Sequence, residues 1–394
     1  MPLHHAYIVA AKRTPIGTYL GGLSSLTAPH LGKAAIEAAL AQAKLPLDAI
    51  GEVFMGNVLS AGIGQAPARQ ASLAAGLSNT IPTTTVSKVC GSGLQAVILA
   101  ARSIAVGDAE VVVAGGMECM SQVPYYLPKA RQGYRLGDGK LIDGMMHDGL
   151  WDPYNNFPMG MAGELCASEH NISRESQDAF AKESYRRALA AADEGRFDDE
   201  IVTVAVPQRK GEPVLLSRDE EPARGKPEKF AKLRPAFKKD GTITAANASS
   251  LNDGASALVL ASEKAVKQHQ LQPLARIEGY AAAAQAPEWF TTAPAVAMKR
   301  AFDKLSLTPE QVGLYEINEA FSVVTMVCGR LCELDPSHIN VNGGAVALGH
   351  PIGASGARIL TTLLYAMQQR QVERGMASIC IGGGEALALV LQRG

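Results

Sequence analysis

The chain has 394 residues, of which 47% are hydrophobic and 19% are charged, and its 37 Lys and Arg residues nearly balance its 38 Asp and Glu residues. This composition excludes a disordered or collagen-like chain. The near-neutral charge also argues against a nucleic-acid binder, which normally carries a basic excess. At about 150 residues per domain, the length predicts two or three domains or one large fused unit.

The sequence predicts a protein outside the membrane. It contains no uninterrupted apolar run of about 18 residues, which a membrane-spanning helix needs. The apolar stretch 6–11 is too short for a signal peptide and is followed at once by Lys12 and Arg13. The ending, Leu391 to Gly394, matches no retention or peroxisomal signal. We therefore expect a cytoplasmic protein with neither a membrane nor nucleic acid among its partners.

Elements of the first half recur in the second half in the same order. The stretch 45–56, which follows a helical segment, corresponds to the stretch 307–318, which also follows one. A Gly-rich turn, an apolar helix and a strand ending in glycines at 90–116 correspond to those at 350–383. Because strands alternate with helices, the pattern predicts an α/β architecture with mostly parallel sheets covered by helices.

The segment between the two repeats is richer in charged and turn-forming residues, which indicates an inserted domain. It contains a helix predicted from about Arg174 to Glu194, opened by Ser173 and closed by Gly195. The apolar pattern returns at 255–260. The predicted units are a first half-domain at 1–119 completed by about 252–273, an inserted domain at 120–251, and a second half-domain at 274–394.

The six cysteines are too sparse for a disulfide framework, and no spacing with histidine resembles a metal site. We expect Cys166, Cys328 and Cys332 to be small buried hydrophobic residues. Cys90 and Cys380 differ from these because glycines follow both of them.

Cys90 lies where a short strand meets a Gly-Ser-Gly turn and then a helix. The positive end of the helix dipole favours a thiolate there, so Cys90 is a candidate nucleophile. One alternative is a dinucleotide site, because residues 91–96 match GxGxxA; the nearest acidic residue after the next strand, Glu118, is 25 positions beyond Gly93. The other alternative is a merely buried cysteine.

Three further loops hold polar residues at the ends of predicted elements. His350 lies in a glycine-dense turn, Asn318 follows a strand, and Cys380 and Gly382 end the last strand. Taken singly, each has an ordinary structural explanation. Taken together, they place two thiols, an imidazole and an amide near one cleft outside the carboxyl ends of strands, where ligands of α/β proteins bind.

The order and spacing of these motifs resemble the thiolases over essentially the full chain, and most closely the acetyl-CoA acetyltransferases among them. The motifs are Arg13-Thr14-Pro15-Ile16-Gly17, Val89-Cys90-Gly91-Ser92-Gly93, Gly115-Gly116-Met117-Glu118, Asn247-Ala248-Ser249, Asn252-Asp253-Gly254, Asn318-Glu319-Ala320-Phe321, Gly349-His350-Pro351 and Cys380-Ile381-Gly382-Gly383-Gly384.

The resemblance implies two similar half-domains, each with a mixed five-stranded sheet layered with helices, and a loop domain, assembled as a homotetramer. It implies that Cys90 is the nucleophile, that His350 activates it and that Cys380 is the acid/base for the second acyl-CoA. His350 and a water held by Asn318 would form one oxyanion hole, and the N–H groups of Cys90 and Gly382 the other. No metal or cofactor is implied, because coenzyme A is a substrate and product.

The resemblance also implies the path of coenzyme A. Ser249 would bind the pantetheine amide and Arg224 would lie near the adenine. The residues implied along the path are Leu150, Met159, Leu233, Phe237, Ala248, Phe290, Ala320 and Phe321. Arg131, Arg135 and Lys140 lie in a stretch that resembles the family's tetramerisation loop, close to the nucleotide phosphates; the alternative is a solvated basic surface.

The predicted function is therefore the reversible condensation of two acetyl-CoA to acetoacetyl-CoA and CoA. A degradative thiolase for longer chains is the alternative within the family, since Pro158 stands where many short-chain thiolases have His. Trp289 and Phe290 would disfavour long chains. Outside this activity, the alternatives are a non-catalytic acyl-CoA or lipid carrier and a decarboxylating condensing enzyme.

Overall fold

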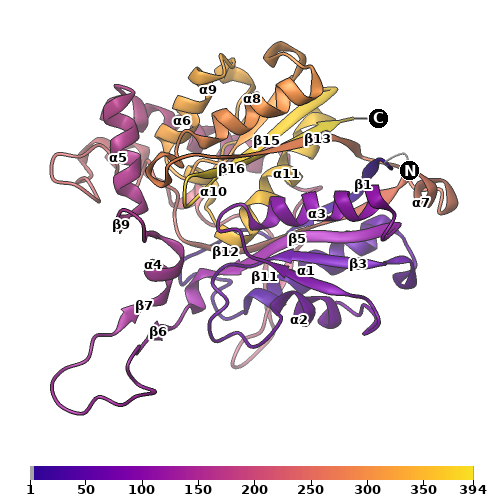
Figure 1. The fold of residues 1–394 in the computed structure, drawn as a ribbon, viewed down its shortest axis with the longest axis horizontal. Coiled ribbons are helices and arrows are strands. Elements are labelled where there is room, and N and C mark those ends of the chain that lie inside the picture. The colour runs from indigo at the N-terminus through magenta and orange to yellow at the C-terminus, as the bar shows by residue number, and fades with distance from the viewer. Residues whose placement is uncertain (1–3, 394) are drawn as a thin grey trace.

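The computed structural model describes residues 4–393. Residues 1–3 and 394, which the predicted half-domains include, lie outside the described residues. A mixed sheet of ten strands forms the centre, in the order β14-β15-β16-β13-β1-β12-β5-β3-β4, with β2 paired to β12 (Figure 1). These strands are β1 (Ala6–Arg13), β2 (Gly17–Thr18), β3 (Glu52–Gly56), β4 (Thr83–Val86), β5 (Val111–Cys119), β12 (Asn252–Ser262), β13 (Ala275–Ala284), β14 (Leu314–Ile317), β15 (Arg374–Ile381) and β16 (Glu385–Gln392).

The two halves of the sheet meet where β1 pairs with β13 over only two residue pairs, Tyr7 with Arg276 and Ile8 with Ala275. The first half has five strands in the sheet order, as the resemblance implies. The second half has four, and at its edge Tyr315 of β14 forms only an isolated bridge with Ile339. The two halves therefore form one continuous sheet, in which only two residue pairs join the halves at the middle.

The prediction of mostly parallel sheets is wrong. Only the pairs β3–β4, β3–β5 and β14–β15 are parallel, whereas the pairs that join β1, β2, β5, β12, β13, β15 and β16 are antiparallel. The last two strands form a local hairpin, whereas β1 and β12 bring distant parts of the chain together. Pairings between distant segments leave no trace in the local alternation of strands and helices. The mixed sheet that the resemblance implies is confirmed.

Helices cover the sheet halves and fill the space between them. The inner pair is α3 (Ser92–Val106) and α11 (Ile352–Gln369), which pack on each other and on strands of both halves. The outer helices and short connecting helices are α1 (Ala28–Ala43), α2 (Pro67–Ala74), α7 (Glu263–Gln268), α8 (Ala293–Leu305), α9 (Ser322–Leu331) and α10 (Ala345–Leu348). Figure 1 shows the resulting layers: outer helices, one half of the sheet, the inner helices α3 and α11, the other half of the sheet, and outer helices again.

One described segment, Val89–Val106, is long and apolar enough to cross a membrane by its hydropathy, and 61% of it is buried in the structure. It contains α3. Because α3 packs between the two halves of the sheet, its apolar character is that of a core helix.

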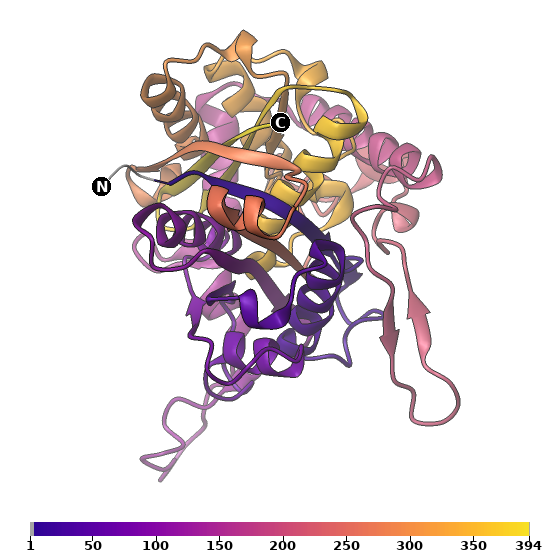
Figure 2. The same cartoon turned by 90° about the vertical axis from the view of Figure 1, so that its right-hand side faces the viewer.

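The segment 120–251 contributes no strand to the ten-stranded sheet. It holds β6 (Tyr125–Tyr126), β7 (Ile142–Asp143), α4 (Gly144–Gly149), β8 (Trp151–Asp152), β9 (Phe157–Pro158), α5 (Met159–Glu169), α6 (Arg174–Asp193), β10 (Val204–Val206) and β11 (Val214–Leu216). The helix predicted from Arg174 is confirmed: the Ser173 hydroxyl accepts the N–H of Ser176 at its start. The β6–β7 and β10–β11 hairpins both project from the body (Figure 2).

Candidate active site

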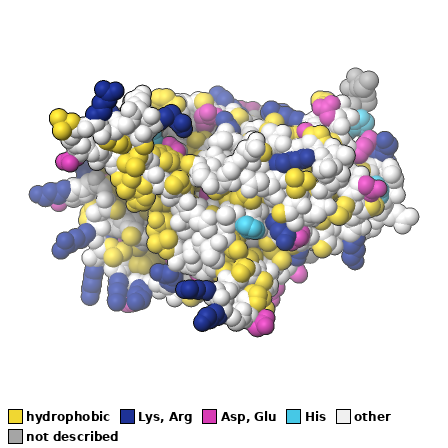
Figure 3. Space-filling model, turned by 90° about the horizontal axis from the view of Figure 1, so that it is seen from below, with side chains coloured by type: hydrophobic (Ala, Val, Ile, Leu, Met, Phe, Trp, Pro, Cys, Tyr) yellow, Lys and Arg dark blue, Asp and Glu magenta, His cyan; other side chains and the backbone are white. Residues whose placement is uncertain are grey.

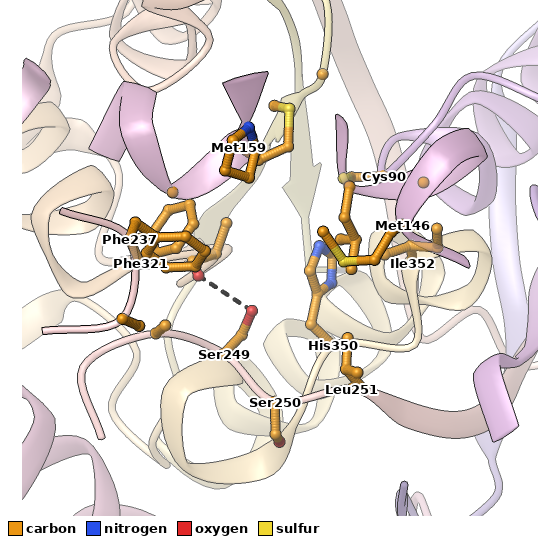
Figure 4. Close-up of a pocket in the computed structure, with 18 of the residues that line it drawn as sticks. Cys90, Met146, Met159, Phe237, Ser249, Ser250, Leu251, Phe321, His350 and Ile352 are labelled. Carbon is orange, nitrogen blue, oxygen red and sulfur yellow. Dashed lines mark hydrogen bonds between the residues drawn. The ribbon is translucent and has the colours of Figure 1, made fainter. Parts of the chain in front are cut away.

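Cys90 lies in a tight turn between β4 and α3. Val89 has a φ of +45°, a left-handed conformation that is costly for a β-branched residue. The Ser92 hydroxyl holds the turn, because it accepts the N–H of Lys88 at 2.8 Å and donates to the Val89 carbonyl at 2.7 Å. Gly91, the N-cap of α3, follows. This turn directs the half-buried Cys90 thiol into a cavity (Figure 4).

The imidazole of His350 lies beside Cys90 in the same cavity (Figure 4). Its Nδ1 is 2.6 Å from the Ser355 hydroxyl, which itself donates to the Pro351 carbonyl at 2.9 Å. Since that hydroxyl proton is already used, Ser355 accepts from Nδ1–H, and the lone pair is on Nε2. The buried Nε2 has no hydrogen-bond partner in the described structure. Nε2 is therefore free to accept a proton.

Burial sets the protonation state of both groups. Desolvation, helped by the charge of Arg358, lowers the pKa of His350 to about 3, so the imidazole is neutral near pH 7. Desolvation raises the pKa of Cys90 to about 11, although the N–H groups of Gly382 and of Cys90 itself bond to the thiol and oppose the rise. Burial therefore acts against the thiolate that the helix N-terminus favours. Cys90 rests as a thiol and needs a base.

Cys380 and Asn318 are buried and are not among the residues that line the cavity, but Cys380 neighbours the lining residue Cys90. Cys380 is the penultimate residue of β15 and is 1% exposed. Its thiol accepts hydrogen bonds from its own N–H and that of Ala320. Burial, and then the neighbouring Cys90, raises the pKa of Cys380 well above its ordinary value. Asn318 follows β14, and both polar atoms of its buried side chain lack a partner in the described structure.

The cavity has a volume of about 330 Å³ and is mostly apolar. Its lining includes eleven of the catalytic and coenzyme A-binding residues that the resemblance implies: Cys90, Leu150, Met159, Phe237, Ala248, Ser249, Phe290, Ala320, Phe321, His350 and Gly382. The Ser249 hydroxyl faces it and donates to the Ala320 carbonyl at 3.0 Å (Figure 4). The structure thus brings together residues from both repeats and from the inserted segment.

Two residues implied along the coenzyme A path do not line this cavity. Leu233 is 37% exposed at the end of a short 3-10 helix. The guanidinium of Arg224 donates to the Thr18 hydroxyl at 3.1 Å. Conversely, sequence reasoning missed several lining residues: Met120, Met146, Gly149, Thr244, Ser250, Leu251 and Ile352. Only Ile352 carried a signal, because it follows His350-Pro351 directly.

Glu118 joins the two halves beneath the site. Its buried carboxylate accepts the Asn57 amide at 2.8 Å and the N–H groups of Val58 at 3.1 Å, Leu59 at 3.3 Å and Gly353 at 3.0 Å. Gly353 has no room for a side chain, since a Cβ there would lie 2.6 Å from this carboxylate. These bonds oppose the desolvation that raises the pKa of Glu118 to about 7. Glu118 is therefore not free to bind a ribose, which contradicts the dinucleotide interpretation.

We expect Glu118→Gln to lower the melting temperature by several degrees. An amide can accept at only one of its two ends, so its NH₂ would face two buried N–H donors, at a cost of about 1–3 kcal/mol for each lost bond. Scanning calorimetry measures the shift. Glu110→Gln is the matched control, because Glu110 is half exposed and pairs with Lys264 at the surface. Equal melting temperatures for both variants would contradict the role assigned to Glu118.

Comparisons with known proteins identify the family of the chain. The family model of the thiolase N-terminal domain matches residues 6–264, and that of the thiolase C-terminal domain matches residues 271–393. The chain belongs to the thiolase family. Both the resemblance to thiolases and the interpretation of the chain as an acyltransferase enzyme are thereby confirmed.

Named relatives of this thiolase cover nearly its whole length. Acetyl-CoA acetyltransferase 1 of Arabidopsis thaliana is 53% identical over 98% of this chain and 93% of the relative, and acetyl-CoA acetyltransferase of Pseudomonas aeruginosa is 51% identical over 98% of both. A cytosolic acetyl-CoA acetyltransferase of Gibberella zeae is 49% identical over the same shares. The Acat5 thiolase of Ascaris suum, solved in complex with coenzyme A, has a TM-score of 0.94 and 45% identity, covering 99% of this chain and all of that one.

Proposed function

We propose that this thiolase is an acetyl-CoA C-acetyltransferase, which converts two acetyl-CoA to acetoacetyl-CoA and CoA and catalyses the reverse reaction. The observation that carries the proposal is the neutral Nε2 of His350 beside the Cys90 thiol, with a second thiol, Cys380, close enough for the two thiols to perturb each other. The names of the relatives support the choice of substrate.

In the proposed first step, Nε2 of His350 takes the proton of Cys90 as the sulfur attacks the acetyl carbonyl. The N–H groups of Gly382 and Cys90, which meet at the thiol in the free protein, stabilise the oxyanion. The bond to coenzyme A sulfur then breaks, and the departing thiolate takes the proton of Cys380. The raised pKa of Cys380 means that the group is protonated before this step and that its thiolate is a strong base for the next one.

In the proposed second step, the Cys380 thiolate removes a proton from the α-carbon of a second acetyl-CoA. The protonated Nε2 of His350 and a water on Asn318 stabilise the enolate oxygen, and the unpartnered side chain of Asn318 is available for such a water. The α-carbon attacks the acetyl group on Cys90, and the leaving sulfur takes back the proton from His350. All protons balance, and no step requires a metal or a further cofactor.

The proposed coenzyme A path runs from the apolar cavity to a basic rim. Ala236 and Phe237, which line the cavity, belong to a segment that carries the exposed cations Lys226, Lys229, Lys232, Arg234, Lys238 and Lys239. Figure 3 shows Lys and Arg side chains gathered along one edge of the molecule beside hydrophobic surface. Cations at the rim suit the phosphates of coenzyme A, and the apolar cavity suits its pantetheine arm.

The acyl end of the cavity favours short chains in this proposal. Phe290 is buried, and its ring lies 6.5 Å from that of Phe321, between centroids. An assay of CoA-dependent thiolysis tests the proposal with acetoacetyl-CoA and a long-chain 3-ketoacyl-CoA side by side. We expect preference for acetoacetyl-CoA. Preference for the long substrate would move the assignment to the degradative thiolases, a requirement for a malonyl donor in synthesis would favour a decarboxylating enzyme, and turnover of neither substrate would favour the carrier.

The pH dependence of acylation tests the state of His350. We expect the rate of the first CoA release not to fall between about pH 7 and pH 5, the interval in which an exposed histidine gains its proton. His350 stays neutral there because burial lowers its pKa to about 3. Glu118 gains a proton in this interval, because its pKa is about 7. The negative charge of Glu118 raises the pKa of Cys90, so loss of that charge makes the thiol easier to deprotonate and does not slow its attack. Stopped-flow measurement that found a loss centred near pH 6.5 would contradict this.

We further propose a homotetramer in the cytoplasm. Residues 127–141 of the β6–β7 hairpin are all exposed, and Leu136 is 100% exposed. An apolar side chain held far from the body suits contact with another copy of the chain. Light scattering after gel filtration is expected to give four chains for the native protein and fewer after Leu136→Asp. A tetramer that persists unchanged in the variant would contradict the role of the hairpin, and subcellular fractionation tests the location.

A further inference from the structure

A second cavity, larger than the one at Cys90, lies between α6 and α9. It has a volume of about 530 Å³, and its lining shares no residue with the active-site cavity. Most of its surface is apolar, from residues such as Phe180, Met326, Leu334 and Ile339. Figure 1 shows α6 and α9 side by side, and the two helices are in contact. The size is within the range of cavities that hold small ligands.

A polar cleft of about 290 Å³ adjoins this cavity, and the two share Glu183 and Arg187 as a common wall. The cleft is lined by four arginines, Arg186, Arg187, Arg196 and Arg370, but by only two carboxylates, Glu183 and Glu194. Glu183 pairs with Arg186 and Arg187, and Glu194 pairs with Arg196. The cleft therefore carries an excess of positive charge.

Arg370 is the arginine of the cleft that forms no ion pair in the described structure. In the described part of the chain, its guanidinium takes part in no ion pair and no side-chain hydrogen bond. Burial and the charges of Arg196 and Arg187 lower its pKa, and the charge of Glu194, which already pairs with Arg196, opposes this in part. A guanidinium in this position suits an oxyanion, to which it can donate two parallel hydrogen bonds.

We propose that the cleft and the cavity together bind an amphiphilic oxyanion, with a phosphate or carboxylate head at Arg370 and Arg196 and an aliphatic chain between α6 and α9. Glu319 forms part of the cavity wall, where its carboxylate accepts from Ser184 at 2.8 Å and Asn340 at 2.8 Å. Because Glu319 follows Asn318 in the chain, the ligand would lie directly behind a loop of the active site.

Titration calorimetry on the intact protein, with excess CoA present to fill the active site, tests this with octyl phosphate, octanoate, inorganic phosphate and octanol. We expect octyl phosphate or octanoate to bind at one site per chain, the tighter of the two identifying the head group. Inorganic phosphate and octanol each lack half of the ligand, so we expect both to bind at least about tenfold more weakly.

Two variants locate the site. Arg370→Ala is expected to weaken binding of the amphiphile at least about tenfold, since it removes the unpaired guanidinium. Arg209→Ala, on the projecting hairpin, is the control and is expected to leave binding unchanged. The proposal is overturned if neither amphiphile binds, if inorganic phosphate binds as tightly as octyl phosphate, or if Arg370→Ala binds like the native protein. None of these results bears on the activity at Cys90, because the two cavities share no residue.

Discussion

Cys90→Ala is expected to lower the turnover of acetoacetyl-CoA by about four orders of magnitude or more. Without the thiol there is no covalent acetyl intermediate, and condensation or thiolysis would have to occur in one step between two bound thioesters. His350 would keep its free Nε2 but have no nucleophile to activate. Steady-state assays in both directions measure the loss.

The matched control for this loss is Cys166→Ala. Cys166 is a buried cysteine on α5 that the proposed mechanism does not use. We expect this variant to retain most of the native rate, and both variants to remain folded by circular dichroism. A folded Cys90→Ala protein that kept even one tenth of the native rate would show that Cys90 is not the nucleophile.

Cys380→Ala is expected to separate the two half-reactions. The variant should release one CoA per active site from acetyl-CoA, because a thiolate is an adequate leaving group without assistance, and then stop. Loss of the base at the α-carbon is expected to reduce formation of acetoacetyl-CoA by about 10²–10⁴-fold. Quench-flow measurement of CoA and acetoacetyl-CoA in the first turnovers distinguishes the two steps.

A second buried thiol controls for the change in volume. Cys328 is fully buried close to Cys380, and its thiol donates to the Thr291 carbonyl at 3.3 Å. Cys328→Ala should cost some stability and leave both half-reactions in place. If Cys380→Ala condensed acetyl-CoA as fast as Cys328→Ala, the acid/base role of Cys380 would be refuted.

Local sequence patterns predicted the position of the main groups. Cys90, His350 and Gly382 each follow a strand or precede a helix, and the structure brings all three to one cavity. The limits of α6 were also predictable, because a capping serine and a closing glycine mark them. In each case the deciding signal lies within a few residues of the feature.

Long-range features could not be predicted in this way. Glu118 binds backbone groups from segments near 58 and 353, so its role exists only once the two halves have packed together. The antiparallel strands likewise arise from pairings between distant segments. The high pKa of Cys90 depends on burial by many residues, which a helix N-terminus in isolation does not show. Such features need the three-dimensional structure.

The most direct test of the proposed mechanism is to locate the acetyl group after acetyl-CoA is mixed with the Cys380→Ala protein. Acid quenching, digestion and peptide mass spectrometry would identify the modified residue. We predict one acetyl group per chain, on the peptide that contains Cys90, and none in a Cys90→Ala/Cys380→Ala double variant. An acetyl group on any other residue, or no covalent adduct while CoA is still released, would contradict the proposal that Cys90 carries the acyl group.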